Sequence, residues 1–365
     1  MFRNFSFILL VALALLAVGV VTACAPTPTP TPPTATLVPP TLPPATATQA
    51  LPSSTPSTPP TPGGPVSWVW TITGEPDKFG APTGLAVDKQ GNVLVYDAGN
   101  ARIVKYSSAG KLITQWGSRG AGDGQFGQVP MGTSTGSSPE MTMGDLKVDG
   151  QGNIYVADQG NRRIEKFDSN GKFLLAWGTE GKDDGQFQSP VGVAVDSKGN
   201  VYVSDQLASR VQKFDGNGKF LTKFGGPGNA NGEFSNMVYM ITDDQDNLYV
   251  TDINTGNVQK FDPNGKFLAK WDSCGDRGLA RPTGLAVDNQ GNLYVTELGA
   301  RTLGANSPGP RVCKLDRAGH SVFAWGSRGA GDGQFIRPYA VAVDGEGNVY
   351  VADTNNQCIQ KFHQQ

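Results

Sequence analysis

A unit that recurs six times between residues 66 and 365 predicts an all-β fold, a six-bladed β-propeller. Each unit contains a Gly-Asn or Asp-Asn turn and short β-branched and aromatic runs such as Ile154–Val156, and the segment shows no helical periodicity. A β-sandwich does not need sixfold self-similarity, and a linear solenoid needs terminal caps. The six turn asparagines are Asn92, Asn153, Asn200, Asn247, Asn292 and Asn348.

The first 24 residues resemble the start of a bacterial lipoprotein. Arg3 supplies a positive charge, and residues 5–21 form an almost uniformly apolar run. A short apolar run after a basic start is typical of a secretory signal peptide. The sequence Val-Thr-Ala-Cys24 resembles a lipobox, in which the cysteine becomes the lipid-modified first residue. We therefore expect residues 1–23 to be a signal peptide. The alternative is a membrane-spanning anchor, but the run is short and no basic cluster follows it.

Residues 24–65 are predicted to form a disordered linker that starts at the lipid anchor. Fifteen of the 26 prolines and eleven threonines fall within residues 25–65, together with no charged residue. Such a composition cannot bury enough apolar surface to offset the entropy of the chain. Alternating Thr-Pro favours extended polyproline II, at ~3.1 Å per residue, so the segment would reach roughly 100 Å. We expect it to hold the folded domain, residues 66–365, away from the membrane.

The ring is predicted to close by strand exchange between the two ends of the folded segment. The last unit, residues 338–365, stops after its third strand at Ile359–Phe362. A fourth strand stands instead at the beginning, as Ser67-Trp-Val-Trp-Thr71, and it precedes the first unit. We expect this N-terminal strand to complete the last blade, because a closed ring leaves no free sheet edge.

The repeat resembles the NHL family. The matching pattern is clearest at Pro82–Tyr106, which reads Pro-x-Gly-Leu-Ala-Val-Asp-x-x-Gly-Asn-Val-x-Val-x-Asp-x-x-Asn-x-Arg-Ile-x-Lys-Tyr. The resemblance covers residues 66–365 and implies a six-bladed propeller. It does not select a function, because that family includes protein-binding and RNA-binding platforms and some metal-dependent lyases. Similar six-bladed shapes also serve lactonases and sugar-binding proteins.

The strand order predicts which loops share a face of the propeller. The turns between strands 1 and 2 and between strands 3 and 4 lie on one face. The loops between strands 2 and 3 lie on the other, with the links between blades. Two insertions, Gly127–Met141 and Leu298–Pro310, fall on this second face. Loops that lengthen on one face often form a binding surface, although neutral surface insertions are the alternative.

Five residues near the start of the blades are predicted to surround the central opening and to bind a ligand. Forked guanidinium groups and tyrosine rings would grip an anionic or sugar-like molecule. Salt bridges and packing between blades are the alternative role for these side chains. The five residues are Asp145, Tyr239, Arg281, Arg337 and Tyr339.

Other charged residues recur in most blades, so we expect them to form structural pairs. An acid ends each second strand, and an arginine begins the third strand of four blades. The Asp-x-x-Gly-Asn runs lack the ligand spacing of a calcium loop, and a hairpin turn explains them better. The acids and arginines are Asp97, Asp158, Asp205, Asp252, Glu297, Asp353, Arg102, Arg163, Arg210 and Arg311.

The chain has only two histidines, and this argues against a histidine-based active site. His320 falls in a short turn on the face opposite the insertions, and His363 lies two residues from the end. No Ser-His-Asp or Cys-His set can be drawn from them. The alternative is a hydrolase or lyase of lactonase type, with calcium bound by Asp145 and Asn236. We expect no other cofactor.

The charge balance and the cysteine count bound the partners and the location. Thirty Lys and Arg against 32 Asp and Glu argue against a nucleic-acid binder driven by bulk charge. Three cysteines follow the lipidated one, Cys274, Cys313 and Cys358, and the sequence does not choose a disulfide pair among them. We predict a monomeric extracytoplasmic binding or scaffolding module, held at the cell membrane by the lipid on Cys24. Its ligand, a protein or a glycan, would meet the face with the long loops.

Overall fold

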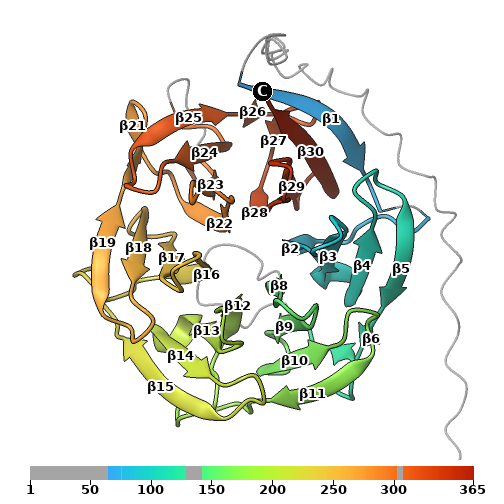
Figure 1. Ribbon diagram of the computed structural model, residues 1–365, viewed down its shortest axis with the longest axis vertical. Coiled ribbons are helices and arrows are strands. Elements are labelled where there is room, and N and C mark those ends of the chain that lie inside the picture. Colours follow the sequence, from blue (N-terminus) through green and yellow to red (C-terminus); the bar gives the residue numbers. More distant parts are fainter. Residues whose placement is uncertain (1–64, 75, 129–141, 302–306) are drawn as a thin grey trace, which may run out of the picture. The chain divides into compact units, whose positions relative to one another are not determined.

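The computed structural model describes residues 65–74, 76–128, 142–301 and 307–365. In these residues, six four-stranded antiparallel sheets follow one another around a ring (Figure 1). The first strand of each sheet lies nearest the centre and the fourth strand lies on the outside. The predicted all-β six-bladed propeller is confirmed. The predicted signal peptide, Cys24 and nearly all of the linker lie outside the described residues.

Each of the first five blades is built from four consecutive strands. Blade 1 contains β2 (Pro82–Val87), β3 (Val93–Asp97), β4 (Arg102–Tyr106) and β5 (Leu112–Trp116). Blade 2 contains β8 (Leu146–Val148), β9 (Ile154–Asp158), β10 (Arg163–Phe167) and β11 (Phe173–Trp177). Blade 3 contains β12 (Pro190–Val195), β13 (Val201–Asp205), β14 (Arg210–Phe214) and β15 (Phe220–Gly225). Blade 4 contains β16 (Met237–Thr242), β17 (Leu248–Asp252), β18 (Asn257–Phe261) and β19 (Phe267–Trp271). Blade 5 contains β22 (Pro282–Val287), β23 (Leu293–Glu297), β24 (Arg311–Leu315) and β25 (Ser321–Trp325).

Blade 6 joins the two ends of the propeller, as the sequence predicted. It contains β28 (Pro338–Val343), β29 (Val349–Asp353), β30 (Cys358–Gln364) and β1 (Val66–Ile72). The outer strand β1 runs antiparallel to β30, with Val66 opposite Gln364 and Ile72 opposite Ile359. Figure 1 shows β1 beside β30 on the outside of the ring. The first and the last blade-forming segments of the chain therefore share one sheet.

The Asp-x-x-Gly-Asn runs form the tight turns between first and second strands. In blade 1, Asp88 Oδ1 accepts the backbone N–H groups of Gln90 and Asn92 at 3.0 and 2.9 Å. Gly91 has a φ of +77°, a conformation that glycine adopts without steric cost. The aspartate is thus used by its own turn, as the hairpin interpretation expected. Two single 3-10 turns, η1 (Ala98–Asn100) and η2 (Gln206–Ala208), join second to third strands.

Four of the six links between blades share one design in the described residues. Four links end in a buried phenylalanine that pairs in parallel with an earlier residue of the same link. The pairs are β6 (Ser118–Arg119) with β7 (Gln125–Phe126), β26 (Ser327–Arg328) with β27 (Gln334–Phe335), Glu180 with Phe187, and Pro227 with Phe234. In the link into blade 5, β20 (Ser273–Cys274) and β21 (Arg277–Gly278) form an antiparallel hairpin instead.

The apolar core lies between adjacent blades and at the centre of the ring. Between blades 6 and 1, for example, Tyr350 and Ala352 pack with Val95 and Val104. A separate central cluster draws buried side chains from blades 3, 4, 5 and 6. Its members are Val191, Val238, Tyr239, Ile253, Leu298 and Tyr339, with Met143 packed against them.

Candidate functional site: a cationic cavity beside blade 5

Each second strand ends in an acid that fastens the link leading into its own blade. In blade 1, Asp97 Oδ1 accepts the backbone N–H groups of Gly80 and Ala81 at 2.8 and 3.0 Å. Asp97 Oδ2 accepts from Arg102 Nε at 3.0 Å, and the same guanidinium donates to backbone carbonyls of the link. The prediction of structural pairs is confirmed in four blades, so these charges are already used. The other three pairs are Asp158–Arg163, Asp205–Arg210 and Glu297–Arg311.

A glutamine in the middle of the third strand holds the same link a second time. Gln212 Oε1 accepts the N–H of Gly185 at 2.9 Å, and Gln212 Nε2 donates to the carbonyl of Gln186 at 2.7 Å. Gln259 and Gln360 make the same two bonds in blades 4 and 6. We call this pair of bonds the glutamine clamp. Its two bonds reach backbone groups of the Asp-Gly-Gln-Phe motif, the N–H of Gly185 and the carbonyl of Gln186.

Blade 2 has a glutamate, Glu165, at the position of the clamp glutamine. The Glu165 side chain is buried, forms an ion pair with Arg163 and accepts a backbone hydrogen bond from Gly124. Burial raises the pKa of Glu165 to about 8, and the charge of Arg163 opposes that rise. An ionised carboxylate has no proton to donate to the link, whereas a glutamine does. Only the protonated form of Glu165 reproduces the clamp.

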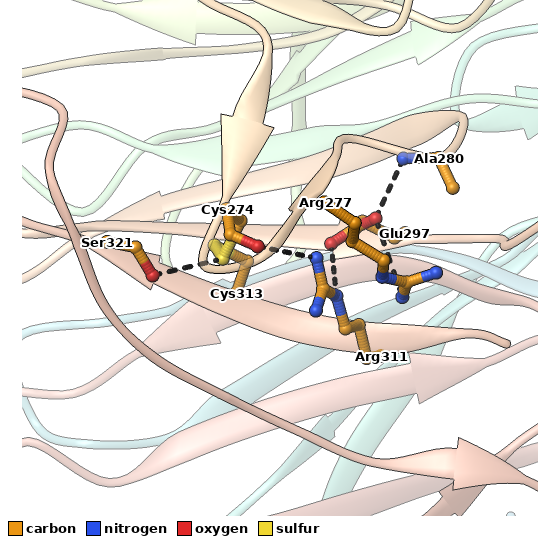
Figure 2. The surroundings of a disulfide bond; sticks show 7 residues. All are labelled: Cys274, Arg277, Ala280, Glu297, Arg311, Cys313 and Ser321. Carbon is orange, nitrogen blue, oxygen red and sulfur yellow. Dashed lines mark hydrogen bonds and ion pairs between the residues drawn. A yellow bond between two sulfur atoms is a disulfide. The ribbon is translucent and has the colours of Figure 1, made fainter. Parts of the chain in front are cut away.

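Blade 5 replaces the glutamine clamp with a disulfide bond (Figure 2). Cys313 in β24 stands where Gln212 stands in β14, and it is bonded to Cys274 in the link. Both cysteines are buried, and their Cα atoms are 6.3 Å apart. The sequence left the pairing open. The structure pairs Cys274 with Cys313 and leaves Cys358 free and buried.

Blade 5 also differs at the acid that ends its second strand, which is Glu297 in place of aspartate. Glu297 Oε2 accepts the N–H of Ala280 at 2.7 Å, and Oε1 accepts from Arg311 Nε at 2.7 Å. The Arg277 guanidinium lies 3.8 Å from Glu297 Oε2 (Figure 2). Arg281, which follows Ala280 in the link, has a φ of +60°, and non-glycine residues adopt this conformation rarely and at an energetic cost. The local backbone of blade 5 is thus turned away from the conformation of the repeat.

An open cavity with a volume of about 660 Å³ lies beside this altered link. Three segments line it. They are Ile253–Gly256 between β17 and β18, Leu279–Arg281 before β22, and Gly299–Arg301 after β23. All three belong to the face that the sequence analysis assigned to the insertions. Gly256 permits a close approach here, because a Cβ atom would lie 2.8 Å from the carbonyl oxygen of Leu279.

The cavity carries arginine charge, and within the described part of the chain no acid lines it. Arg281 Nε is buried and has no hydrogen-bond partner there. Burial lowers the pKa of the Arg281 guanidinium, and the nearby charges of Arg301 and Arg337 lower it further. Arg337 donates to the Tyr339 hydroxyl at 2.7 Å and lies over the Tyr339 ring, 5.2 Å from its centroid. Three like charges at one place favour a bound anion.

The other two predicted ligand-binding residues lie in the buried centre of the ring. The Tyr239 hydroxyl donates to the carbonyl of Thr83 at 2.8 Å, which joins blade 4 to blade 1. Asp145 is fully buried and forms an ion pair with Lys147. Burial raises the pKa of Asp145 to about 6, and Lys147 opposes that rise. Among the five predicted ligand-binding residues, only Arg281 is a described lining residue of the cavity. Arg337 and Tyr339 bond to each other, Tyr339 packs in the central cluster with Tyr239, and Asp145 and Tyr239 have protein partners.

The groups considered for a metal site also have protein partners. The Asn236 side-chain carbonyl accepts from Gln206 Nε2 at 2.8 Å. His320 Nδ1 lies 3.0 Å from Asp316, in the turn after β24, and His363 Nδ1 lies 2.9 Å from Asn348. Within the ranges that the structure describes, no three His, Cys, Asp or Glu residues gather closely enough to hold a metal ion.

The two predicted insertions are described in part. Of Gly127–Met141, residues 129–141 lie outside the described residues, and of Leu298–Pro310, residues 302–306 do. Arg301, the last described residue before residues 302–306, is exposed and lines the cavity. The insertion was predicted to form part of the binding face, but this arginine was not among the predicted site residues. The sequence feature that could have identified Arg301 is a basic residue inside a blade-specific insertion on the proposed binding face.

Three segments of the chain match the family model of the NHL repeat, residues 79–106, 187–214 and 335–362. Each match begins at the buried phenylalanine of a link and ends with the third strand of the following blade. The chain therefore contains NHL repeats, and the resemblance is confirmed at the level of the repeat. The E3 ubiquitin-protein ligase TRIM71 of Rattus norvegicus is 44% identical over 61 residues, 16% of this chain and 7% of that protein. NHL repeat-containing protein 3 of Homo sapiens is 29% identical over 106 residues, 28% of this chain and 26% of that protein.

The chain spans about a quarter or less of the length of these curated relatives. Among solved structures, streptogramin B lyase matches with a TM-score of 0.54 and 15% identity, over 81% of this chain and 98% of that one. A protein of unknown function from Bacteroides thetaiotaomicron matches with a TM-score of 0.59 and 19% identity, over 82% and 76%. A gluconolactonase from Xanthomonas campestris matches with a TM-score of 0.54 and 16% identity, over 79% and 88%. At these identities the likeness shows the fold alone.

None of the helices in the described residues has the length and apolar character needed to cross a bilayer.

Proposed function

We propose that this chain is a membrane-anchored extracytoplasmic binding protein. The lipid on Cys24 holds it at the cell membrane, residues 24–65 act as a spacer, and the propeller presents a ligand site on the face of the insertions. Stable anchoring usually needs two membrane-binding groups, such as two acyl chains, and each methylene buried in the bilayer contributes roughly 0.8 kcal/mol of binding free energy. The spacer keeps the propeller accessible to a ligand outside the membrane.

The observation that carries the binding proposal is the cavity beside blade 5. Arginines gather at it without an acid among the described residues, and Arg281 Nε is buried there without a partner. A buried donor that lacks an acceptor costs about 1–3 kcal/mol, which a ligand oxygen would recover. In blades 3 and 4 the residues at the position of Arg281 are uncharged, Ser189 and Asn236, and both have protein partners. Arg281 instead brings an unpartnered buried donor to the cavity.

The disulfide supports the extracytoplasmic location. Cys274 and Cys313 are both buried and bonded in blade 5. Disulfides persist in oxidising compartments and are rare in the reducing cytosol. A signal peptide at residues 1–23 would deliver the chain to such a compartment.

The binding proposal is tested with a glycan array and with candidate protein partners, using the full-length chain in a mild detergent. Arg281→Ala combined with Arg337→Ala should weaken the ligand at least tenfold, because charge-assisted contacts of ~1.5–3 kcal/mol are lost. Lys111→Ala combined with Lys219→Ala removes two exposed charges from the opposite face and should change affinity by no more than about twofold. The opposite ranking of the two double variants would move the site to the other face.

A propeller hydrolase or lyase that uses calcium is the second candidate function. Its support is the fold, which streptogramin B lyase and the gluconolactonase share. Against it, the proposed calcium ligands Asp145 and Asn236 are engaged by Lys147 and Gln206. Metal analysis of the purified full-length chain separates the two functions. Calcium bound at one equivalent, and lost in Asp145→Asn, would favour the enzyme.

The proposal also includes the partners. With a net charge of −2 the chain has no bulk attraction for nucleic acid, and we propose that it acts as a monomer. Closure through β1 pairs the outer edge of β30 within the same chain, which supports a self-contained ring.

A further inference from the structure

The cavity beside blade 5 has the size of a small-molecule site. Ligand pockets usually enclose about 300–1,000 Å³, and this cavity falls within that range at about 660 Å³. A stable protein partner instead needs an interface of about 1,200 Å² or more. The cavity therefore suits a small ligand or the terminal unit of a longer one.

The walls of the cavity combine an apolar floor with a polar rim. Ile253 and Leu279 are buried and supply the apolar part. Asn254 is exposed, and the Thr255 hydroxyl accepts from Asn257 Nδ2 at 2.8 Å, which leaves its own proton free to donate. A sugar ring has the matching surface, because its C–H face is apolar and its edge carries hydroxyl groups.

The charge of the cavity selects an acidic ligand. Arg281 has a buried Nε without an acceptor, and Arg301 adds an exposed charge at the rim. The nearby carboxylate of Glu297 is already held by Ala280, Arg277 and Arg311 (Figure 2). It therefore does not neutralise Arg281. A guanidinium fork matches the oxygens of a carboxylate or a phosphate.

Resting on the proposed binding function, we propose that this cavity binds an acidic sugar, a sugar ring that carries one carboxylate or phosphate group. Arg281 contacts the anionic group, and Arg301 adds long-range attraction. Asn254 and Thr255 contact the ring hydroxyls, and the ring lies on Ile253 and Leu279. Carboxylate and phosphate offer the same oxygen chemistry, so the test has one arm for each.

The test is isothermal titration of the full-length chain, in a mild detergent at low salt, with four probes. Glucuronate and glucose 6-phosphate carry the two anionic groups, and glucose and inorganic phosphate each carry half of the proposed ligand. We expect saturable binding of glucuronate, glucose 6-phosphate or both, at least tenfold tighter than glucose or phosphate. Binding should weaken as salt rises.

The decisive variant is Arg281→Gly, because glycine adopts a φ of +60° without strain. It removes the guanidinium while keeping the fold, so its melting temperature should equal or exceed that of the wild type. Its affinity for the acidic sugar should fall at least tenfold, and Arg301→Ala should lower affinity about threefold. The control Lys219→Ala, an exposed lysine on the opposite face, should stay within twofold.

Three results would overturn the inference. These are glucose binding as tightly as the acidic sugars, an unchanged affinity in Arg281→Gly, and no binding of either acidic sugar at millimolar concentration. The outcome for the proposed function is read separately. If a neutral glycan or a protein binds and Arg281→Gly abolishes that binding, the acidic-sugar inference fails and the binding function stands. If the array ligand responds to Lys219→Ala and not to Arg281→Gly, the site itself is misplaced.

Discussion

The disulfide of blade 5 should stabilise the propeller more than any single glutamine clamp. Cys274 and Cys313 are separated by 39 residues. A cross-link that closes a loop of this length lowers the entropy of the unfolded chain by an amount worth roughly 4 kcal/mol. A clamp of two neutral hydrogen bonds contributes about 1–3 kcal/mol. We therefore expect the double variant Cys274→Ala with Cys313→Ala to lose roughly 4 kcal/mol of unfolding free energy.

For a domain of this size, ~2 °C of melting temperature corresponds to 1 kcal/mol, so the double variant should melt about 8 °C below the wild type. The measurement is a thermal melt followed by circular dichroism. Cys358→Ala is the matched control, because it removes a buried sulfur that forms no disulfide. A reducing agent should lower the melting temperature of the wild type by a similar amount and should leave the double variant unchanged. If the double variant melts within 2 °C of the Cys358→Ala control, the clamp argument is wrong.

Three further predictions address closure, pH and anchoring. Deletion of residues 66–74 removes β1 and should lower the melting temperature sharply or cause aggregation, since the edge of β30 is left open; an unchanged melt would contradict closure. The pKa of Glu165 is about 8 in the folded protein and near 4.5 in the unfolded chain. Between these two pH values the folded state binds one proton more than the unfolded state, so the free energy of unfolding falls as pH rises from 4.5 to 8. Glu165→Gln should therefore be more stable than the wild type at pH 8, by about 1 kcal/mol or more, and nearly equal at pH 4.5; equal melts at both values would contradict this role. Cys24→Ala should abolish metabolic labelling with a radioactive fatty acid and release the protein from the membrane, and an unlabelled wild type would rule out the lipoprotein.

The fold was predictable because each blade repeats the same short sequence motifs. The turn at Asp88–Asn92, the acid–arginine pair and the β-branched strands all act within one repeat, so their spacing in the sequence carries the structure. Closure was predictable too, because the last unit visibly lacks a fourth strand. The glutamine clamp was not identified, since it joins Gln212 to Gly185 across 27 residues and no single motif contains both partners.

The candidate site was predictable only in part. Of three residues expected at the opening, Arg281 lines the cavity, whereas Arg337 and Tyr339 bond to each other and Tyr339 is buried in the central cluster. Position in the repeat could not reveal that Asp145 and Tyr239 point into the buried centre. Tyr239 lies within the inner strand β16, and Asp145 immediately precedes the inner strand β8. The pairing of Cys274 with Cys313 required the distance between a link and a strand of the next blade.

The departures of blade 5 support one another energetically. A left-handed non-glycine residue such as Arg281 costs about 1–3 kcal/mol, and this blade also lacks the glutamine clamp. The disulfide, at roughly 4 kcal/mol, is comparable in size to both losses together, and it holds the same link from the same strand position. A covalent clamp also leaves the backbone after Arg277 free of the parallel pairing seen in other links. Leu279–Arg281 can then turn toward the cavity. Arg281 is strained and has no protein partner at its Nε, so the nearby cross-link is needed to hold its backbone in place. A side chain that is held in its bound position before the ligand arrives loses less entropy on binding, which favours affinity.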